Sequence, residues 1–469
     1  MIDILTEQRN RILFPAKGED FLHACIQVRE ELRGVATQGD IQPAAEAAAE
    51  LAADLRSFLI EWKLLPYVNT GVLTTAAIDA ESDAFLALAR ELDGDKAVEA
   101  ARCEIESIAH SSMKQLAHLY AAGKLNSYWG HDYASGIAHS LRRGACFSTN
   151  NPCKNTLFKK DFPELYHAML TEIAREAPDA SLEDKVSLLF VKICARHARA
   201  LLPIFECTNE KYGFFCVQVN PFNIPNADST RKIIEQVEFW QEAFKKELGV
   251  ERPNVVYKIP AAESGVEAAK HLSNKGYRLC VTLNFTVAQH EIFAEILSKA
   301  KVPGFVVLMG GLLDDKVAAD LKALNMEDFA ALGRHAAQAV IRKSYANLRA
   351  KGYDKYASIM TAAVRGPWAI SNTFAPMGGA PSCITTLTAK INEFDDAAPL
   401  MVSAMDEPID PQIMNALMKS KVFRQAYATL DEQAWQWDSL FSFPPFVAFY
   451  DQFREAYAEL TEDVRTFNG

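Results

Sequence analysis

From about residue 126 onward, short apolar, β-branched segments alternate with helical segments, and this alternation constrains the fold most strongly. Eight strands are predicted at residues 128–133, 145–149, 214–219, 255–259, 278–283, 305–309, 357–363 and 383–388. Helical patterns separate most of them, at residues 161–174, 182–201, 230–248, 265–275, 288–299, 318–324 and 329–351, and follow Pro411. Eight such alternations are typical of a closed parallel (β/α)8 barrel. An open doubly wound sheet is the competing fold, but no Gly-x-Gly-x-x-Gly follows the first strand.

The first 125 residues have a different pattern. Residues 44–65 are rich in strong helix formers, with Leu51, Leu55 and Leu59 at helical spacing, and residues 97–122 repeat the pattern. We therefore expect a helical extension over residues 1–125 and a (β/α)8 barrel with carboxy-terminal helices over residues 126–469. The apolar stripes of the extension need a partner, either the outer face of the barrel or a second subunit in a homo-oligomer.

Composition limits the cellular setting and the partners. No apolar run is long enough to cross a bilayer, and the segment Met1–Glu7 lacks the basic and apolar regions of a secretion signal. Nine cysteines without a paired spacing indicate a reducing cytoplasm, and most of them lie in apolar surroundings. A net charge of −11 argues against general nucleic-acid binding. The isolated histidines and the lack of a metal motif predict neither a metal site nor a cofactor.

Lys258 interrupts an apolar strand segment, one residue before its end, where only hydrocarbon is expected. Burying an ammonium is costly, so a lysine in such a strand tends toward the free amine, which can attack a carbonyl and form a Schiff base. The simpler interpretation is an edge-strand lysine whose ammonium extends into water. On this segment alone the simpler interpretation is favoured.

The sequence around Lys258 changes that balance. Residues 258–289, KIPAAESGVEAAKHLSNKGYRLCVTLNFTVAQ without interruption, resemble the Schiff-base region of the transaldolase family. Residues 148–152, Ser-Thr-Asn-Asn-Pro, resemble the family's Thr-Asn-Pro turn after the second strand. Asp132 precedes Asn151 by 19 residues. From Asn151 the separations are 67 residues to Gln218, then 40 to Lys258 and then 24 to Thr282. All four separations are similar to the family's. The resemblance extends from about residue 132 to residue 388.

The resemblance implies a role for each of seven residues. Lys258 would attack a ketose carbonyl, and Asp132 would transfer the proton at the cleaved carbon–carbon bond. Thr282 and Gln218 would position the catalytic water. Three residues would contact the substrate: Asn151, Asn284 and Arg365. Structural interpretations compete with several of these roles: a helix cap before Ala134 for Asp132, a strand filler for Thr282, a turn residue for Asn151 and a surface arginine for Arg365.

Three positions depart from the family pattern. Gln218 stands where transaldolases have a glutamate, and an amide can orient a water but cannot exchange a proton with it. The fructose-6-phosphate aldolase branch also has glutamine there, paired with a tyrosine on strand six. The position of that tyrosine aligns with Leu308 in this chain, and the position of the family's strand-six serine aligns with Val306. Gly311 replaces the first phosphate-binding arginine, whereas Arg365 matches the second. The amides of the Gly310-Gly311 pair could bind an anion, although a simple turn into a helix is the more economical interpretation.

The sequence therefore predicts a metal-independent transferase that moves a three-carbon ketol unit between sugar phosphates or related sugars. The family's place in carbohydrate metabolism, in the pentose phosphate pathway, is implied with it. One alternative is an aldolase that releases the three-carbon unit. The other is a non-catalytic scaffold that binds sugar phosphates. Retention of Lys258 with Asp132 weighs against the scaffold, because a buried lysine without a role is easily replaced by an apolar residue.

Overall fold

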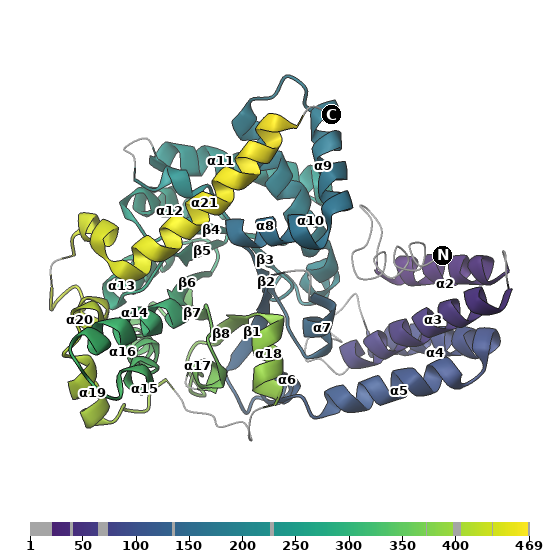
Figure 1. Ribbon diagram of the computed structural model, residues 1–469, viewed down its shortest axis with the longest axis horizontal. Coiled ribbons are helices and arrows are strands. Elements are labelled where there is room, and N and C mark those ends of the chain that lie inside the picture. Colours follow the sequence, from purple (N-terminus) through teal and green to yellow (C-terminus); the bar gives the residue numbers. More distant parts are fainter. Residues whose placement is uncertain are drawn as a thin grey trace.

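The computed structural model describes residues 21–37, 41–63, 74–133, 137–225, 229–371, 373–396, 405–433 and 435–467. Its centre is a closed barrel of eight strands (Figure 1). The strands are β1 (Ser127–Asp132), β2 (Ser148–Thr149), β3 (Phe215–Gln218), β4 (Val255–Pro260), β5 (Leu279–Thr282), β6 (Gly304–Met309), β7 (Ala357–Ala362) and β8 (Ser382–Thr386). The predicted (β/α)8 barrel is confirmed, and each strand lies within three residues of its predicted ends.

All neighbouring strands are parallel, and β8 closes the barrel by pairing with β1. The register places Gln218 of β3 beside Lys258 of β4, and Pro260 of β4 beside Thr282 of β5. Because parallel strands all point the same way, the carboxyl ends of the eight strands meet at one rim. In barrels of this kind that rim carries the chemistry.

Helices connect the strands on the outside of the barrel. After β1 to β4 they are α7 (Ile137–Arg142), α8 (Pro152–Asp161), α9 (Pro163–Glu176), α10 (Leu182–Cys207), the 3-10 turn η1 (Pro221–Asn223), α11 (Ser229–Leu248) and α12 (Glu263–Lys275). After β5 to β7 they are α13 (Val287–Leu297), α14 (Gly310–Ala323), α15 (Phe329–Gly333), α16 (Ala336–Ala350) and α17 (Pro367–Ser371). After β8 come α18 (Thr388–Asp395), α19 (Pro411–Leu417), α20 (Lys421–Tyr427), η2 (Trp437–Ser442) and α21 (Pro444–Thr466).

Five described helices precede β1, as the amino-terminal sequence pattern predicts. They are α2 (Phe21–Ala36), α3 (Ile41–Lys63), α4 (Thr75–Asp93), α5 (Lys96–Ala109) and α6 (Ser112–Ala121). The pattern over residues 97–122 is divided into two helices, because the Ser111 hydroxyl accepts from the backbone N–H of Lys114 and begins a new helix. Residues 64–65 of the predicted helix and the segment 1–7 lie outside the described residues.

The amino-terminal helices divide into two groups by what they contact. Helix α3 packs against α2, α4 and α5, and Figure 1 shows these helices extending to one side of the barrel. An ion pair between Arg142 of α7 and Asp54 of α3 connects this group to the barrel. Helix α6 instead packs against β1 and α18, and its first turn is held there by Asp395, which accepts from Ser111 at 2.7 Å. We propose that α2–α5 are the extension proper and that α6 is built into the barrel.

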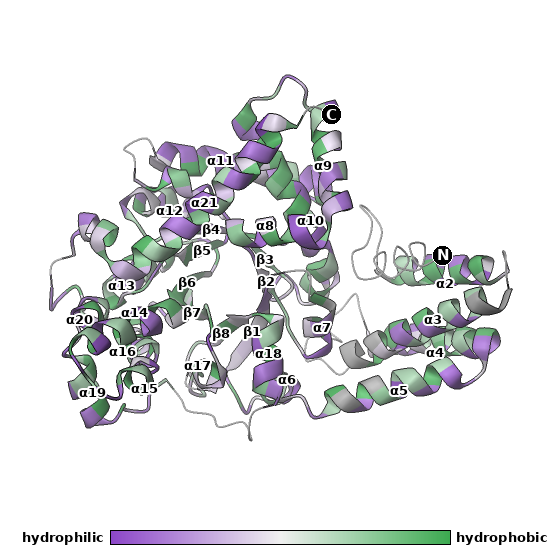
Figure 2. Cartoon of the chain, in the orientation of Figure 1, coloured by the Kyte–Doolittle hydropathy of each residue, from purple (hydrophilic) through white to green (hydrophobic). Residues whose placement is uncertain are grey.

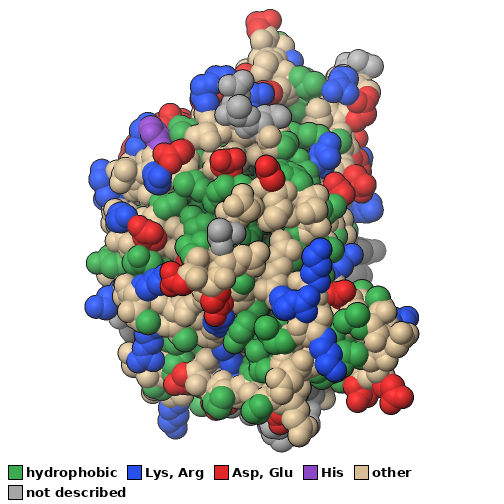
Figure 3. All heavy atoms as spheres, turned by 90° about the vertical axis from the view of Figure 1, so that its left-hand side faces the viewer, with side chains coloured by type: hydrophobic (Ala, Val, Ile, Leu, Met, Phe, Trp, Pro, Cys, Tyr) green, Lys and Arg blue, Asp and Glu red, His purple; other side chains and the backbone are tan. Residues whose placement is uncertain are grey.

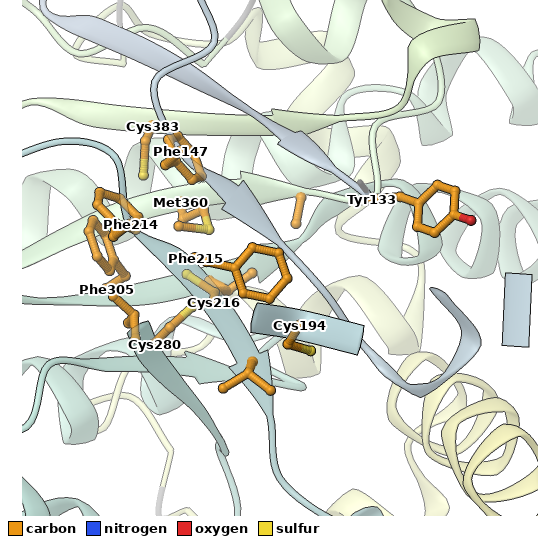
Figure 4. Close-up of a cluster of buried hydrophobic side chains, with 14 of the residues drawn as sticks. Tyr133, Phe147, Cys194, Phe214, Phe215, Cys216, Cys280, Phe305, Met360 and Cys383 are labelled. Carbon is orange, nitrogen blue, oxygen red and sulfur yellow. The ribbon is translucent and has the colours of Figure 1, made fainter. Parts of the chain in front are cut away.

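Figure 4 shows a cluster of buried aromatic and sulfur-containing side chains, in which Phe147, Phe214 and Phe305 lie at the amino ends of β2, β3 and β6. Phe214 stacks on Phe147 and on Phe305, with both pairs of ring centroids 4.9 Å apart. Gly130 of β1 makes room for this stack, because a Cβ there would lie 2.6 Å from the Phe147 ring. The interior below the carboxyl rim is therefore a packed core, as expected for an eight-stranded barrel.

The surface is polar and mixed in charge. Most helices carry both hydrophilic and hydrophobic residues in Figure 2, which is typical of helices with one buried face. Figure 3 shows side chains of both signs scattered among apolar ones on the face that lies at the left of Figure 1. Within the part of the chain that the structure describes, no helix is long and apolar enough to cross a membrane.

Candidate active site

A cavity of about 180 Å³ opens at the carboxyl ends of the strands. Four of the seven residues predicted from the sequence line it: Asp132, Asn151, Lys258 and Arg365. The remaining three, Gln218, Thr282 and Asn284, do not line it but are buried on β3, on β5 and just after β5. The structure thus brings together residues that are up to 233 positions apart in the chain.

Lys258 lies inside the barrel wall near the end of β4 and is only 5% exposed. Its Nζ donates to the backbone carbonyl of Asn150 at 3.1 Å. Among the described residues, no carboxylate lies within ion-pair distance of this amine, although buried lysines are usually paired with one. The alternative of a lysine that extends into water from an edge strand does not fit, because a closed barrel has no edge.

Asp132 ends β1 and is held by a neighbouring hydroxyl. Thr149 of β2 donates to Asp132 Oδ1 at 2.7 Å, and the Thr149 and Thr385 hydroxyl oxygens are 3.1 Å apart. The two threonines also line the cavity. The competing role, a cap before Ala134, falls on residues 134–136, which lie outside the described residues. Among the described residues that line the cavity, Asp132 is the only acidic one, and a carboxylate is a group that can transfer protons.

Asn151 has both a structural and a site-facing role. Its Oδ1 accepts from the backbone N–H of Lys154 at 3.2 Å and caps α8, with Pro152 in the first helical position. Since the side-chain oxygen is committed to the cap, the amide nitrogen is the group that can donate to a bound oxygen. The turn interpretation and the substrate interpretation are therefore compatible.

Gln218 and Asn284 carry buried polar atoms that have no hydrogen-bond partner among the described residues. Gln218 is 3% exposed, and its Oε1 accepts no hydrogen bond. Asn284 is fully buried; its Oδ1 accepts from the N–H of Thr286 at 3.4 Å, but its Nδ2 has no acceptor. Buried polar atoms without a partner are uncommon in folded proteins, and at a binding site they are free to bind a polar group. Thr282, also buried, donates only to the Met309 sulfur at 3.7 Å.

Arg365 follows β7 and is already paired. Its Nε donates to Asp315 Oδ2 at 2.9 Å, and its side chain is 38% exposed. Gly311 lies directly against this segment, because a Cβ at that position would be 2.0 Å from the Ala363 carbonyl oxygen and 2.6 Å from Arg365 Cγ. No side chain fits at position 311, so an arginine cannot occupy it without moving the end of β7. Neither Gly310 nor Gly311 lines the cavity; both begin α14, as a turn into a helix.

The strand-six side chains that reach the cavity are Val307 and Met309. The family resemblance predicts Val306 and Leu308 at the site, but alternate residues of a strand face opposite sides, so these two face away from the cavity that Val307 and Met309 line. The expectation that strand six supplies neither a serine nor a tyrosine is unchanged, because valine and methionine are equally apolar.

Several cavity residues were not singled out from the sequence. The carboxy-terminal helix α21 contributes Phe449, Gln452 and Phe453, and it packs against α8, α10 and α14 over this end of the barrel (Figure 1). Gln452 is tied to the rim by its carbonyl, which accepts from the Cys153 thiol at 3.6 Å. No local signal could have identified α21, since its helical pattern says nothing about what it covers. Thr149 could have been found, because it lies within the Ser-Thr-Asn-Asn-Pro segment.

Backbone strain collects at the same rim. Tyr133 has a φ of 130°, Leu283 of 56° and Ala363 of 59°, and each directly follows a strand. Non-glycine residues rarely adopt positive φ, and such residues are concentrated at functional sites.

Beside Asp132, burial lowers the pKa of His131 to about 3, so this imidazole is neutral near pH 7. Among the described residues, no group of three or more His, Cys, Asp or Glu side chains could hold a metal ion.

Comparison with known proteins gives consistent results. The family model described as "Transaldolase/Fructose-6-phosphate aldolase" matches residues 141–433. A transaldolase of Neisseria gonorrhoeae (strain ATCC 700825 / FA 1090) is 26% identical over 155 residues, covering 33% of this chain and 40% of that protein. One from Helicobacter pylori (strain ATCC 700392 / 26695) is 26% identical over 196 residues, covering 39% and 55%. One from Mycobacterium leprae (strain Br4923) is 26% identical over 261 residues, covering 51% and 66%. The chain thus spans less than two thirds of the length of these relatives.

Proposed function

The chain belongs to the transaldolase/fructose-6-phosphate aldolase family, and from this premise we propose that it transfers a three-carbon ketol unit between sugar phosphates through a Schiff base on Lys258. The observation that carries the proposal is a buried amine, 5% exposed, in a cavity that also holds Asp132. A carboxylate partner would hold such a lysine as an ammonium, whereas attack on a carbonyl needs the free amine. The site supports attack because the partner of Nζ is a neutral carbonyl.

In the proposed reaction, Lys258 Nζ bonds to the ketose carbonyl carbon, and the carbinolamine loses water to give an iminium ion. Asp132 accepts the proton of the hydroxyl next to the breaking carbon–carbon bond, and an aldehyde leaves. The iminium takes up the electron pair as an enamine. The enamine then attacks an acceptor aldehyde, and Asp132 returns its proton to the oxygen of that aldehyde as the new carbon–carbon bond forms. Hydrolysis of the resulting iminium ion releases the new ketose and Lys258.

The other predicted residues have supporting roles in this proposal. Gln218 and Thr282 position the water that is lost and regained, and the unpartnered Gln218 Oε1 is suited to accept from it. Asn151, Asn284 and Arg365 contact the bound sugar. Thr149, whose hydroxyl donates to Asp132 at 2.7 Å, orients the carboxylate for proton transfer.

Borohydride trapping tests the proposal. Reduction in the presence of fructose 6-phosphate or dihydroxyacetone should add a three-carbon mass to the peptide that contains Lys258. Lys258→Met should give no adduct, and Lys270→Met, a substitution at an exposed lysine of α12, should trap normally. Modification of another lysine, or no adduct with any ketose, would contradict the assignment and favour a sugar-phosphate-binding scaffold.

An aldolase that releases the three-carbon unit is the second candidate, and Gln218 favours it. An amide cannot exchange a proton with the water at the site, so proton transfer during capture of the acceptor is less well supported than with a glutamate. Product analysis with and without erythrose 4-phosphate separates the two activities. Free dihydroxyacetone in equal yield under both conditions would identify the aldolase.

A further inference from the structure

We propose that Lys154, on the first turn of α8, is the cation that binds the anionic group of the substrate, a phosphate monoester. This inference deepens the proposed function and rests on it for the identity of the substrate. Lys154 lines the same cavity as Lys258 and Asp132. It was not among the residues that the sequence pointed to.

The ammonium of Lys154 is available to a ligand. The side chain is half-buried, and within the described residues it makes no ion pair with a carboxylate. Its Nζ lies 5.9 Å from the centroid of the Tyr133 ring, a loose contact that aids placement of the charge without neutralising it. A free cation on the wall of a cavity attracts an anion, since partial desolvation strengthens the interaction.

The other cations of the cavity have competing partners or tasks. Lys258 is the proposed nucleophile and becomes bonded to the substrate. Arg365 is paired with Asp315 at 2.9 Å, which offsets its charge. Three cationic side chains line the cavity against the single carboxylate of Asp132, so the excess positive charge that remains is mainly that of Lys154.

Backbone donors do not offer an equal substitute. The N–H of Lys154 is already bonded to Asn151, at 2.9 Å to its carbonyl and 3.2 Å to its side chain. The Gly310-Gly311 amides do not line the cavity, and Gly311 has no room for a side chain. The structure therefore offers the side chain of Lys154 on α8, rather than the beginning of α14, as the group that binds the anion.

A lysine recognises an anion differently from an arginine. Its ammonium is a compact point charge on a flexible stem, without the planar fork that fits two phosphate oxygens at once. Binding through Lys154 should therefore depend on the presence of the charged group more than on its exact orientation. Short phosphorylated sugars that differ in chain length should be accepted with similar affinity.

The test compares charged and uncharged ligands in the full-length protein. Glycerol 3-phosphate binding is measured by calorimetry in the native protein and in Lys154→Gln, Lys154→Arg and Lys160→Gln. Lys160 lies on the same helix but is exposed and outside the cavity, so its substitution is the matched control. We expect Lys154→Gln to weaken binding by about tenfold, as for loss of one charge-assisted hydrogen bond. Lys154→Arg should retain most of the affinity, and Lys160→Gln all of it.

A kinetic comparison uses fructose 6-phosphate and dihydroxyacetone as substrates. Lys154→Gln should raise the KM for fructose 6-phosphate by a similar factor, with little change in kcat and none in the trapping of dihydroxyacetone. Unchanged calorimetric affinity in Lys154→Gln overturns the inference, whatever the activity. Loss of phosphate binding in that variant, combined with no borohydride adduct in the native protein, leaves Lys154 as an anion site and instead rejects the Schiff-base function.

Discussion

The two ends of the barrel interior are built from opposite kinds of residue. At the amino end, Phe147, Phe214 and Phe305 stack at 4.9 Å beside buried cysteines. At the carboxyl end, the buried amine of Lys258 lines a cavity. The unpartnered Gln218 Oε1 and Asn284 Nδ2 and several residues with positive φ lie at the same rim. Close packing of apolar groups stabilises the fold, whereas unpaired buried polar groups cost stability. The comparison assigns stability to one end and chemistry to the other.

The sharpest test of this division is Lys258→Met. It should abolish adduct formation and turnover, because the other lysine that lines the cavity, Lys154, is assigned to the anionic group of the substrate. The free energy of unfolding should stay the same or rise, since methionine fills a similar volume without a buried amine. Activity assays and urea denaturation measure the two effects. A large loss of stability would mean that Lys258 supports the fold, and the division would fail.

Asp132→Asn should reduce kcat by about 10² to 10⁴, the usual contribution of an acid–base group. The amide preserves shape and can still accept from Thr149, so stability should change little. Steady-state kinetics with thermal melting checks both quantities. Gln218→Ala should lower kcat less than Asp132→Asn, and the reverse order would reassign the proton transfer.

At the amino end, Phe214→Ala should lower the free energy of unfolding by about 3 to 5 kcal/mol, because it leaves a cavity in a close-packed stack. The folded fraction should keep its kcat. Denaturant unfolding measures the loss, with Phe239→Ala, at a site 37% exposed, as the control. Phe214→Leu is the milder variant if Phe214→Ala does not fold. A fall in kcat with either variant would show that packing at the amino end of the barrel affects the chemistry at the carboxyl end.

Acid should lower the free energy of unfolding through two buried histidines, His131 on β1 and His290 on α13. Burial lowers the pKa of His131 to about 3 and that of His290 to about 4, from an ordinary value of 6.5. The unfolded chain therefore binds more protons between these values, and the free energy of unfolding should fall as the pH drops below 6.5. The slope should be about 1.4 kcal/mol per pH unit for each histidine. Urea titrations from pH 7 to pH 5 measure it, and His290→Gln should reduce it.

The smallest expected effect is a gain at the carboxyl end. Gln218→Glu restores the family's acidic residue beside Lys258 and should raise transfer to an acceptor aldehyde by less than about 10²-fold. The new carboxylate also needs burial, so a modest loss of stability should accompany the gain. Transfer assays with erythrose 4-phosphate measure it. A large loss of activity would indicate that the carboxylate pairs with Lys258 and holds it as an ammonium.

The site illustrates how far sequence reasoning reaches. Lys258 is predicted from a local signal, a charge in an apolar strand, whereas Asp132 is predicted from the family resemblance and its separation from Asn151. The structure places both at one cavity. On strand six the resemblance predicts Val306 and Leu308 at the site, whereas Val307 and Met309 line the cavity. The period of two shows that side chains alternate, but it does not show which alternate residues face inward. Lys154 carries no local signal, because a lysine on the first turn of a helix is ordinary until the helix is seen to open on a cavity.

The sequence by itself determined the eight strands, their order, the helices before them and the lysine in the fourth strand, because period, propensity and burial cost act over a few neighbouring residues. Only the tertiary structure decided what meets at the rim. It placed Phe449 and Phe453 of α21 over the cavity and brought Gly311 against Arg365, which leaves no room for a side chain at position 311. It also put Lys154 on the cavity wall. These contacts join residues far apart in the chain, and they depend on barrel closure and side-chain volume, which no local pattern encodes.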